Sequence, residues 1–381
     1  MTSTPYPIIH WQEAGAEQFA RWRSEAGVVP PEKIVAVDDT LTADAAFRLA
    51  RDGTALLWRG DYQNARNLLQ ALARRADRKP RLGTPKQAPT PAEAFHQHRQ
   101  AQGERARILG ALLLPLTADF RIPLRRGQDV QQACREALGA ESVDSVISLR
   151  GLLALVSAHE WRKKGALVPA LGARIHPHFG VFSPVRGEYV DLVANAPLPA
   201  SCELAFDIGT GSGVLAAVLA RRGIRRVVGT DQDPRALSCA TENARNLGLA
   251  NIEIIEADLF PAGKAPLVVC NPPWVPAQPS SPIEYAVYDP DSRMLRGFLE
   301  GLAAHLEAAG EGWLIISDLA EHLGLRSREE LLGWIAAGGL KVLGRIDTRP
   351  RHPKARDADD PLHAARSAEV TSLWRLGHLD S

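Results

Sequence analysis

The sequence has few cysteines and no long hydrophobic run. Its four cysteines (Cys134, Cys202, Cys239 and Cys270) show neither CxxC nor mixed Cys/His spacing, which argues against a disulfide framework and a zinc site. No run of about 18 apolar residues occurs, and the start MTSTPYPIIH lacks the basic and apolar parts of a signal peptide. We therefore expect a cytoplasmic protein with no metal and no membrane partner.

The composition also lacks a strong bias of any kind. Hydrophobic residues make up 45% and charged residues 23%, which excludes a wholly disordered or collagen-like chain. A length of 381 residues exceeds the usual size of one hydrophobic core. We expect two domains, residues 1–165 and residues 166–381, with the boundary in the run rich in Gly and Pro between about 165 and 183. That run is expected to form a β-ribbon or connector.

The net charge of +1 hides an asymmetry between the two parts. Residues 1–165 hold 24 Lys and Arg against 18 Asp and Glu, whereas residues 166–381 hold 21 against 26. The densest basic stretch is Arg74, Arg75, Arg78, Lys79, Arg81 and Lys86. A solvated helix end followed by a loop explains this stretch best, although the first part could also face an anionic partner.

Residues 1–165 are predicted to be mainly helical. Apolar residues recur at helical spacing in FRLARDG, NARNLLQALARRAD, ERARILGALLLPL and ISLRGLLALVSAHEWRKKG. One strand is expected at TALLWRG. This strand and the helix that opens at Asp61 are too little to indicate a duplicated domain. Substrate recognition is the role that we consider for residues 1–165.

Beyond residue 200, predicted strands alternate with predicted helices. The expected strands are ELAFDI, RVVGT, IEIIEA, PLVVC, GWLIIS, KVLGRID and VTSLWRL. The expected helices are 214–222, 234–247, LRGFLEGLAAHLEAA and SREELLGWIAAG. Such alternation predicts an α/β fold with a doubly wound, mostly parallel sheet. The last two strands would form a closing pair, separated by a polar 348–369 loop of open function.

A glycine-rich turn follows the first of these strands. The strand ends at Asp207, and the chain turns through Gly209, Gly211 and Gly213 into a helix, where backbone N–H groups can face a ligand. A dinucleotide fingerprint would place its third glycine at position 214, where Val214 stands. The G-x-G-x-G spacing therefore favours a nucleoside ligand other than a dinucleotide.

Two further aspartates close the next two strands. Asp231 lies 24 positions after Asp207, where a carboxylate can accept both ribose hydroxyls of a nucleoside. Asp258 closes the third strand, within reach of an adenine amino group. Because ligands of open α/β sheets bind at the carboxyl ends of the strands, we expect these side chains to line one crevice.

The series DIGTGSG, GTDQDP, EADLF and NPPW resembles the seven-stranded class I S-adenosylmethionine methyltransferases. The resemblance covers about residues 178–381, where four elements agree in order and spacing. It implies S-adenosyl-L-methionine as cofactor, and it implies that GVFSPVRGEYVDLV forms an entry helix. The cofactor-binding residues that it implies are Asp207, Gly209, Thr210, Gly211, Gly213, Asp231, Asp258 and Leu259.

The motif Asn271-Pro272-Pro273-Trp274 follows the fourth strand into the same crevice. Two prolines fix an extended backbone and remove two N–H groups, so the Asn271 side-chain oxygen and the Pro272 carbonyl are left to accept from an NH2 group. Trp274 would stack on the planar group and exclude water. We expect these four residues to be catalytic by orienting a nitrogen in line with the methyl group.

The same motif resembles two groups of enzymes with different substrates. NPPWVPA and YDPDSRMLRGFLEGL are closer to the glutamine-N5 methyltransferases of translation release factors. GVFS and the basic first part favour methyltransferases of ribosomal RNA, acting on guanine N2 or adenine N6. A non-catalytic RNA- or protein-binding module with the same fold is the alternative from another class. The sequence leaves the substrate and the oligomeric state open.

Overall fold

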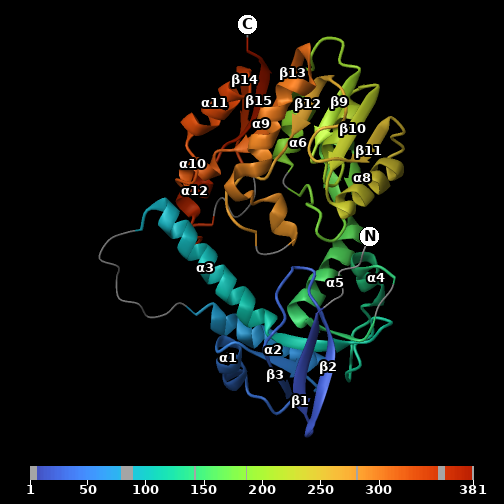
Figure 1. Ribbon diagram of the computed structural model, residues 1–381, viewed down its shortest axis with the longest axis vertical. Coiled ribbons are helices and arrows are strands. Elements are labelled where there is room, and N and C mark those ends of the chain that lie inside the picture. The colour runs from blue at the N-terminus through green and yellow to red at the C-terminus, as the bar shows by residue number, and fades with distance from the viewer. Residues whose placement is uncertain are drawn as a thin grey trace. The chain divides into compact units, whose positions relative to one another are not determined.

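The computed structural model describes residues 7–78, 89–140, 143–185, 187–279, 282–350 and 357–379. The chain forms two compact units, each with its own sheet (Figure 1). The first comprises Met1–Ala88 and His96–Glu160, and the second comprises Pro89–Phe95 and Trp161–Ser381. Among the described residues, every helix falls short of the length and apolarity that a membrane crossing needs.

The second unit is built on a seven-stranded sheet (Figure 1). In chain order the strands are β9 (Leu204–Ile208), β10 (Arg226–Asp231), β11 (Ile252–Glu256), β12 (Ala265–Cys270), β13 (Leu306–Ser317), β14 (Leu340–Thr348) and β15 (Thr371–His378). In space they lie in the order β11, β10, β9, β12, β13, β15, β14. The first five run parallel, and β15 runs antiparallel to both neighbours. The predicted doubly wound, mostly parallel sheet with its closing pair is confirmed.

Helices cover both faces of this sheet. The helices of this unit are α6 (Glu188–Asn195), α7 (Val214–Arg221), α8 (Pro234–Asn246), α9 (Arg293–His305), α10 (Leu319–His322), α11 (Arg328–Ala337) and α12 (His363–Ala368), of which α10 and α12 pack on each other beyond the sheet. Alternate residues of β12 point to opposite sides, as a pleated strand requires. Leu267 and Val269 pack with α6 and α7, whereas Val268 and Cys270 pack with α9 and α11. Both faces are therefore buried, which explains the nearly continuous apolar sequences of the strands.

Short elements complete the second unit. Strands β7 (Ala166–Val168) and β8 (Ala173–Ile175) form the expected β-ribbon around the 3₁₀ helix η1 (Pro169–Leu171). Two further 3₁₀ helices, η2 (Pro282–Ala286) and η3 (Pro290–Ser292), precede α9. The Asp233 side chain caps α8 by accepting from the Arg235 N–H at 2.9 Å, with Pro234 at the first helical position.

One helix ends earlier than its apolar pattern predicts. The sequence LRGFLEGLAAHLEAA suggests a helix that continues to residue 309, but α9 ends at His305 and β13 begins at Leu306. Leu306 is fully buried and pairs with Ala265 of β12. Sheet pairing at this buried position outweighs the helical propensity of LEAA, which is a weak local preference.

The first unit contains a six-stranded sheet, in the order β1, β2, β6, β5, β4, β3. Its strands are β1 (Ile8–Glu13), β2 (Ala16–Arg23), β3 (Lys33–Val37), β4 (Thr54–Trp58), β5 (Leu112–Leu116) and β6 (Ser145–Ser148). Its helices are α1 (Ala43–Arg51), α2 (Tyr62–Ala76), α4 (Gln131–Leu138), most of α3 (Pro91–Gly110) and most of α5 (Leu149–Lys164). Helices hold more residues than strands, but the six-stranded sheet was not expected in a mainly helical domain.

The expectation of a single strand in this part is wrong. The strand predicted at TALLWRG is β4, but LLLPL, predicted as the end of a helix, forms strand β5. Likewise, the start of ISLRGLLALV belongs to strand β6, which ends at Ser148, before α5 begins. Short apolar runs fit a buried strand and a buried helical turn equally well, so periodicity alone could not separate them.

The basic stretch at the end of α2 is partly neutralised. The Arg75 Nε donates to the Asp44 carboxylate at 2.8 Å, and the Arg105 Nε donates to Asp77 at 2.6 Å. Lys79, Arg81 and Lys86 lie outside the described residues, as do residues 351–356 of the 348–369 loop. The described part of the stretch is thus an exposed helix surface with local ion pairs, which contribute little to stability.

Candidate functional site

The carboxyl ends of three neighbouring strands bring the predicted site residues together. Strands β10, β9 and β12 lie side by side and run parallel. Ile208 at the end of β9 pairs with Thr230 of β10 and with Cys270 of β12. The residues that follow these three positions are Gly209, Asp231 and Asn271, so the glycine turn, the second aspartate and the NPPW motif begin at the same edge of the sheet.

The glycine turn depends on backbone conformations that favour glycine. Gly209, Gly211 and Gly213 have φ angles of +68°, +54° and +78°. A Cβ on Gly213 would lie 3.1 Å from the Cα of Ala240, so the turn also packs tightly on α8. A Cβ on Gly211 would meet only the Gly209 carbonyl oxygen, at 3.9 Å. The turn is therefore crowded towards α8 and open at Gly211, where a ligand can approach the backbone.

Asp207 lies beneath the turn and holds it. Its side chain is buried, and its Oδ2 accepts hydrogen bonds from the Thr210 hydroxyl at 2.7 Å and from the Ala216 N–H at 3.0 Å. Burial raises the pKa of Asp207 to about 6, against the lowering effect of these two hydrogen bonds. Asp207 shapes the turn from inside, and its contact with a cofactor stays a prediction.

Asp231 lies beside the turn and is only partly buried. Its Oδ2 accepts from the Gly211 N–H and its Oδ1 from the Asp233 N–H, both at 3.0 Å. Burial raises the pKa of Asp231, partly offset by these backbone hydrogen bonds. A carboxylate offers about four acceptor positions, so this one can still accept from a diol. The predicted role as ribose acceptor fits this geometry.

Asp258 and Leu259 follow β11 on the outer side of Asp231. Asp258 is exposed, and its carboxylate accepts from the side-chain amide of Gln232. Leu259 adopts a φ of +69°, which is unusual for a side chain with a Cβ, and its carbonyl accepts from the Thr230 hydroxyl at 2.5 Å. Asp258 lies two residues beyond Glu256, where β11 ends beside Asp231. Contact of either residue with adenine stays a prediction.

The Asn271 side chain already has one partner in this structure. Its Oδ1 accepts a hydrogen bond of 3.0 Å from the indole Nε1 of Trp274. Val275, the next residue, is held by backbone hydrogen bonds with Val287 and Asp289 at 3.1 and 2.9 Å. Backbone hydrogen bonds therefore hold the chain directly after the motif. The Trp274 N–H is bonded to the Asn271 oxygen, the acceptor that we expected to bind the substrate.

Sequence reasoning missed three residues around these motifs. Met294 at the start of α9 lies over Gly209, where its terminal methyl group occupies the place that a Cβ would take. Asp289 is buried and accepts from the N–H groups of Met294 and Leu295, both at 3.1 Å. Arg326 is buried and donates to the Trp274 carbonyl oxygen at 3.4 Å. Met294 and Arg326 are distant in sequence from Gly209 and Trp274, so no local pattern indicates these two contacts, whereas Asp289 bonds to residues that follow it closely.

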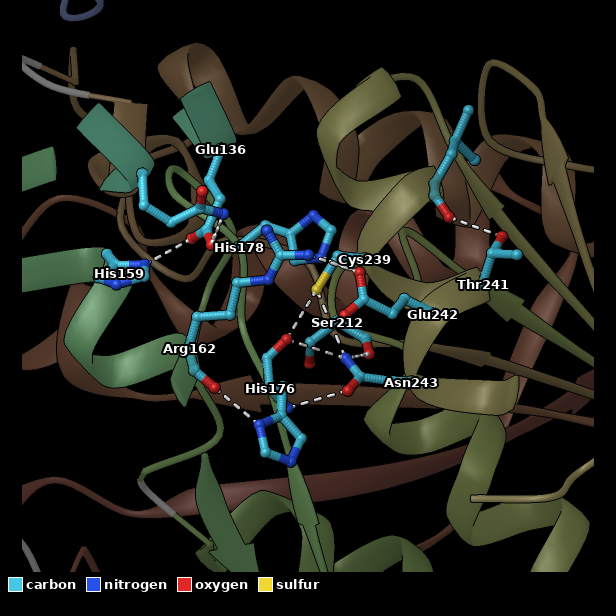
Figure 2. A network of polar contacts seen from close by, with 12 residues as sticks. Glu136, His159, Arg162, His176, His178, Ser212, Cys239, Thr241, Glu242 and Asn243 are labelled. Atoms are coloured by element: carbon cyan, nitrogen blue, oxygen red, sulfur yellow. Dashed lines mark hydrogen bonds and ion pairs between the residues drawn. The ribbon is translucent and has the colours of Figure 1, made fainter. Parts of the chain in front are cut away.

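A buried asparagine also links the glycine turn to the connector before it. Figure 2 shows Asn243 between His176 and Ser212. The Asn243 Nδ2 donates to the Ser212 carbonyl oxygen at 3.0 Å, and its Oδ1 accepts from the His176 N–H at 2.9 Å. Ser212 lies inside the turn, so α8 supports the turn from behind.

The two neighbouring histidines are satisfied by protein partners. The His176 Nδ1 lies 2.7 Å from the Arg162 carbonyl oxygen, and the His178 Nε2 lies 3.0 Å from the Glu242 carboxylate (Figure 2). Arg162 donates to the same carboxylate at 2.6 Å. Both histidines follow strand β8, which ends at Ile175. Their ring nitrogens serve hydrogen bonds within the unit.

Comparison with known proteins agrees with the resemblance drawn from the four motifs. Residues 172–324 match the family model of the methyltransferase small domain. A ribosomal protein L11 methyltransferase of Clostridium perfringens (strain SM101 / Type A) is 47% identical over 68 residues, which cover 17% of this chain and 22% of that protein. A release factor glutamine methyltransferase of Cereibacter sphaeroides is 30% identical over 169 residues, which cover 40% of this chain and 58% of that protein. The chain thus spans less than two thirds of either relative.

Proposed function

We propose that this chain is an S-adenosylmethionine-dependent N-methyltransferase that acts on a planar amide or amino nitrogen of a macromolecule. The observation that carries the proposal is the meeting of the glycine turn, Asp231 and Asn271 at the carboxyl edge of β10, β9 and β12. The match of residues 172–324 to a methyltransferase family supports it.

The residues at this edge fit S-adenosylmethionine. The backbone at Gly211 is open to a ligand, because no described side chain lies within 4 Å of the position that a Cβ would take there. The Asp231 carboxylate supplies acceptors for a ribose diol, which is the donor set of a nucleoside. When bound, the cofactor supplies a methyl group on a sulfonium, which is already activated for transfer.

The chain's own residues would then orient the acceptor nitrogen. The Asn271 Oδ1 and the Pro272 carbonyl oxygen accept from the two N–H bonds of the NH2 group, which aims the nitrogen at the methyl carbon. Trp274 packs on the planar group and keeps water out. The rate gain comes mainly from positioning, because the reaction needs a nitrogen and a carbon held in line.

For the substrate we propose a protein glutamine of the release-factor type. The longer of the two sequence matches is to a release factor glutamine methyltransferase, and it includes 169 residues. The second candidate is a ribosomal RNA base, modified at guanine N2 or adenine N6. The excess of basic residues in the first 165 positions, 24 against 18, favours it. In either case we propose that residues 1–165 assist recognition, that residues 166–381 carry catalysis, and that the protein is cytoplasmic.

Two experiments test these proposals. Isothermal titration with S-adenosylmethionine separates an enzyme from a non-catalytic binding module, because absence of binding at millimolar ligand would remove the enzyme proposal. Radiolabelled cofactor is then offered with purified release factors, ribosomal subunits and total RNA. Label on a release-factor glutamine supports the leading substrate, and label on RNA replaces it with the second candidate.

A further inference from the structure

Arg326 is a buried cation next to the NPPW motif. It lies between α10 and α11, with a side chain 4% exposed. Its Nη1 donates to the Trp274 carbonyl oxygen at 3.4 Å, a long distance for a charged donor. Its Nε and Nη2 atoms are buried and have no hydrogen-bond partner within the described part of the chain. A guanidinium has five N–H bonds. One of them, on Nη1, points at Trp274, and the other four are on Nε, on Nη2 and on Nη1 itself.

The acidic groups near Arg326 are engaged with other partners. Both Glu321 carboxylate oxygens accept from the Arg328 Nε, at 2.8 and 2.9 Å. The Glu330 carboxylate accepts from the Ser327 N–H at 2.7 Å as part of the cap of α11. The Asp289 carboxylate accepts from two N–H groups at the start of α9. The charge of Arg326 is therefore balanced only at a distance, and burial lowers its pKa.

A buried, incompletely paired guanidinium destabilises a fold, so its presence calls for an explanation. The position beside the motif suggests one. The Asn271 side-chain oxygen and the Pro272 carbonyl oxygen are acceptors, which suit an NH2 group. A carboxamide also carries a carbonyl oxygen that needs a donor, and among the described residues Arg326 is the charged donor that contacts the motif.

We propose that Arg326 is a specificity-determining residue that donates a hydrogen bond to the carbonyl oxygen of the carboxamide to be methylated. This inference rests on the proposed function and specifies its substrate class as an amide. The Asn271 oxygen accepts one hydrogen bond from the Trp274 indole, and its second lone pair can accept from the NH2 group. Asn271 would then bind the nitrogen end of the amide, and Arg326 would bind its carbonyl oxygen.

The main test compares Arg326→Met and Arg326→Lys with the control Arg328→Met. Arg328 is two residues away, and its guanidinium is already bonded to Glu321. We expect Arg326→Met to lower kcat/KM on a purified release factor at least ~10-fold, because the amide oxygen loses its donor. Cofactor affinity, measured by titration calorimetry, should stay within about twofold. Arg326→Lys should retain part of the activity, since it keeps a donor without the planar fork.

Stability separates this role from a structural one. Replacing an incompletely paired buried charge by an apolar side chain of similar length should leave Tm unchanged or raise it by about 2–4 °C. A structural arginine would instead lower Tm and cofactor affinity together when removed. The proposal is overturned if Arg326→Met keeps wild-type kcat/KM, if Arg328→Met loses as much activity, or if Arg326→Met melts clearly below the wild type.

A binding measurement decides the question without turnover. In protein labelled with ¹⁵N-arginine, the Nε–H resonance missing from Arg326→Lys identifies Arg326. N-acetylglutamine N-methylamide, added in the presence of S-adenosylhomocysteine, should shift this resonance, whereas N-acetylleucine N-methylamide, which lacks a primary carboxamide, should not do so at equal concentration. Equal shifts or no shift would contradict the proposal. If the wild type methylates none of the offered acceptors, the proposed function is wrong. The Nε–H resonance of Arg326 and the Tm of Arg326→Met still test the role of Arg326 in that case.

Discussion

The indole Nε1 of Trp274 donates a 3.0 Å hydrogen bond to the side-chain oxygen of Asn271. Two residues of one motif are thus hydrogen-bonded to each other. An amide oxygen has two lone pairs, so this bond leaves one acceptor position and fixes its direction. The acceptor geometry at Asn271 therefore depends on the orientation of Trp274 as well as on the end of β12.

Asn271→Ala should separate binding from catalysis. The Asn271 oxygen is bonded to Trp274 and is assigned to the acceptor nitrogen, so S-adenosylmethionine affinity should stay nearly unchanged. Methyl transfer should fall by ~100-fold, because a reacting atom misplaced by about 1 Å costs this much. Titration calorimetry and initial rates with radiolabelled cofactor measure the two effects. Equal label transfer by the variant would remove the catalytic role assigned to Asn271.

Asp231→Ala should weaken cofactor binding by about 1–3 kcal/mol, because a half-buried acceptor of the ribose hydroxyls is lost. Asp233→Ala is the matched control, since it lies two residues away and caps α8. The control should lower the free energy of unfolding by about 1 kcal/mol without changing affinity. Calorimetric titration of both variants tests this. Unchanged affinity in Asp231→Ala would show that the ribose assignment is wrong.

Asp207→Asn should change the pH dependence of stability. Burial raises the pKa of Asp207 to about 6, above its ordinary value of 3.8, so the folded state holds this proton more tightly than the unfolded state. The contribution of Asp207 to stability therefore decreases as pH rises from about 4 to 6.

The amide introduced by this substitution would not titrate, and its side-chain oxygen could still accept from Thr210 and Ala216. Urea unfolding between pH 4 and 7 should show the variant gaining stability relative to wild type by on the order of 1–3 kcal/mol across this range. Asp233→Asn, at the exposed cap of α8, serves as control. A constant difference between Asp207→Asn and wild type would contradict the prediction.

Asn243→Ala should destabilise the second unit and loosen the glycine turn. The substitution leaves the Ser212 carbonyl oxygen and the His176 N–H without their side-chain partner (Figure 2). Each unsatisfied buried group costs about 1–3 kcal/mol. We expect a lower free energy of unfolding together with weaker cofactor binding.

Thr241→Ala is the control for this variant, because the Thr241 hydroxyl bonds only within α8, to the Leu237 carbonyl oxygen. Urea unfolding and calorimetry measure both quantities. If Asn243→Ala binds the cofactor as tightly as Thr241→Ala does, the turn does not depend on support from α8.

Much of the second unit could be predicted because its signals are local. The seven strands, the closing pair and the β-ribbon follow from apolar periodicity with Gly, Pro and Asp at the ends of elements. The glycine turn, Asp231 and Asn271 could be placed at one edge because parallel strands align their carboxyl ends. In the first unit, by contrast, LLLPL and the start of ISLRGLL could not be assigned, since a short buried strand and a buried helical turn have the same composition.

By itself, the sequence determined the fold class of the second unit and the residues of its motifs, because both depend on neighbours in the chain. Only the tertiary structure decided which atoms meet. It placed Asp207 under the turn, turned the Trp274 N–H towards Asn271 and brought Arg326 to the Trp274 carbonyl from 52 residues away. Burial and hydrogen bonding between distant segments are properties of packing, and no local pattern encodes them.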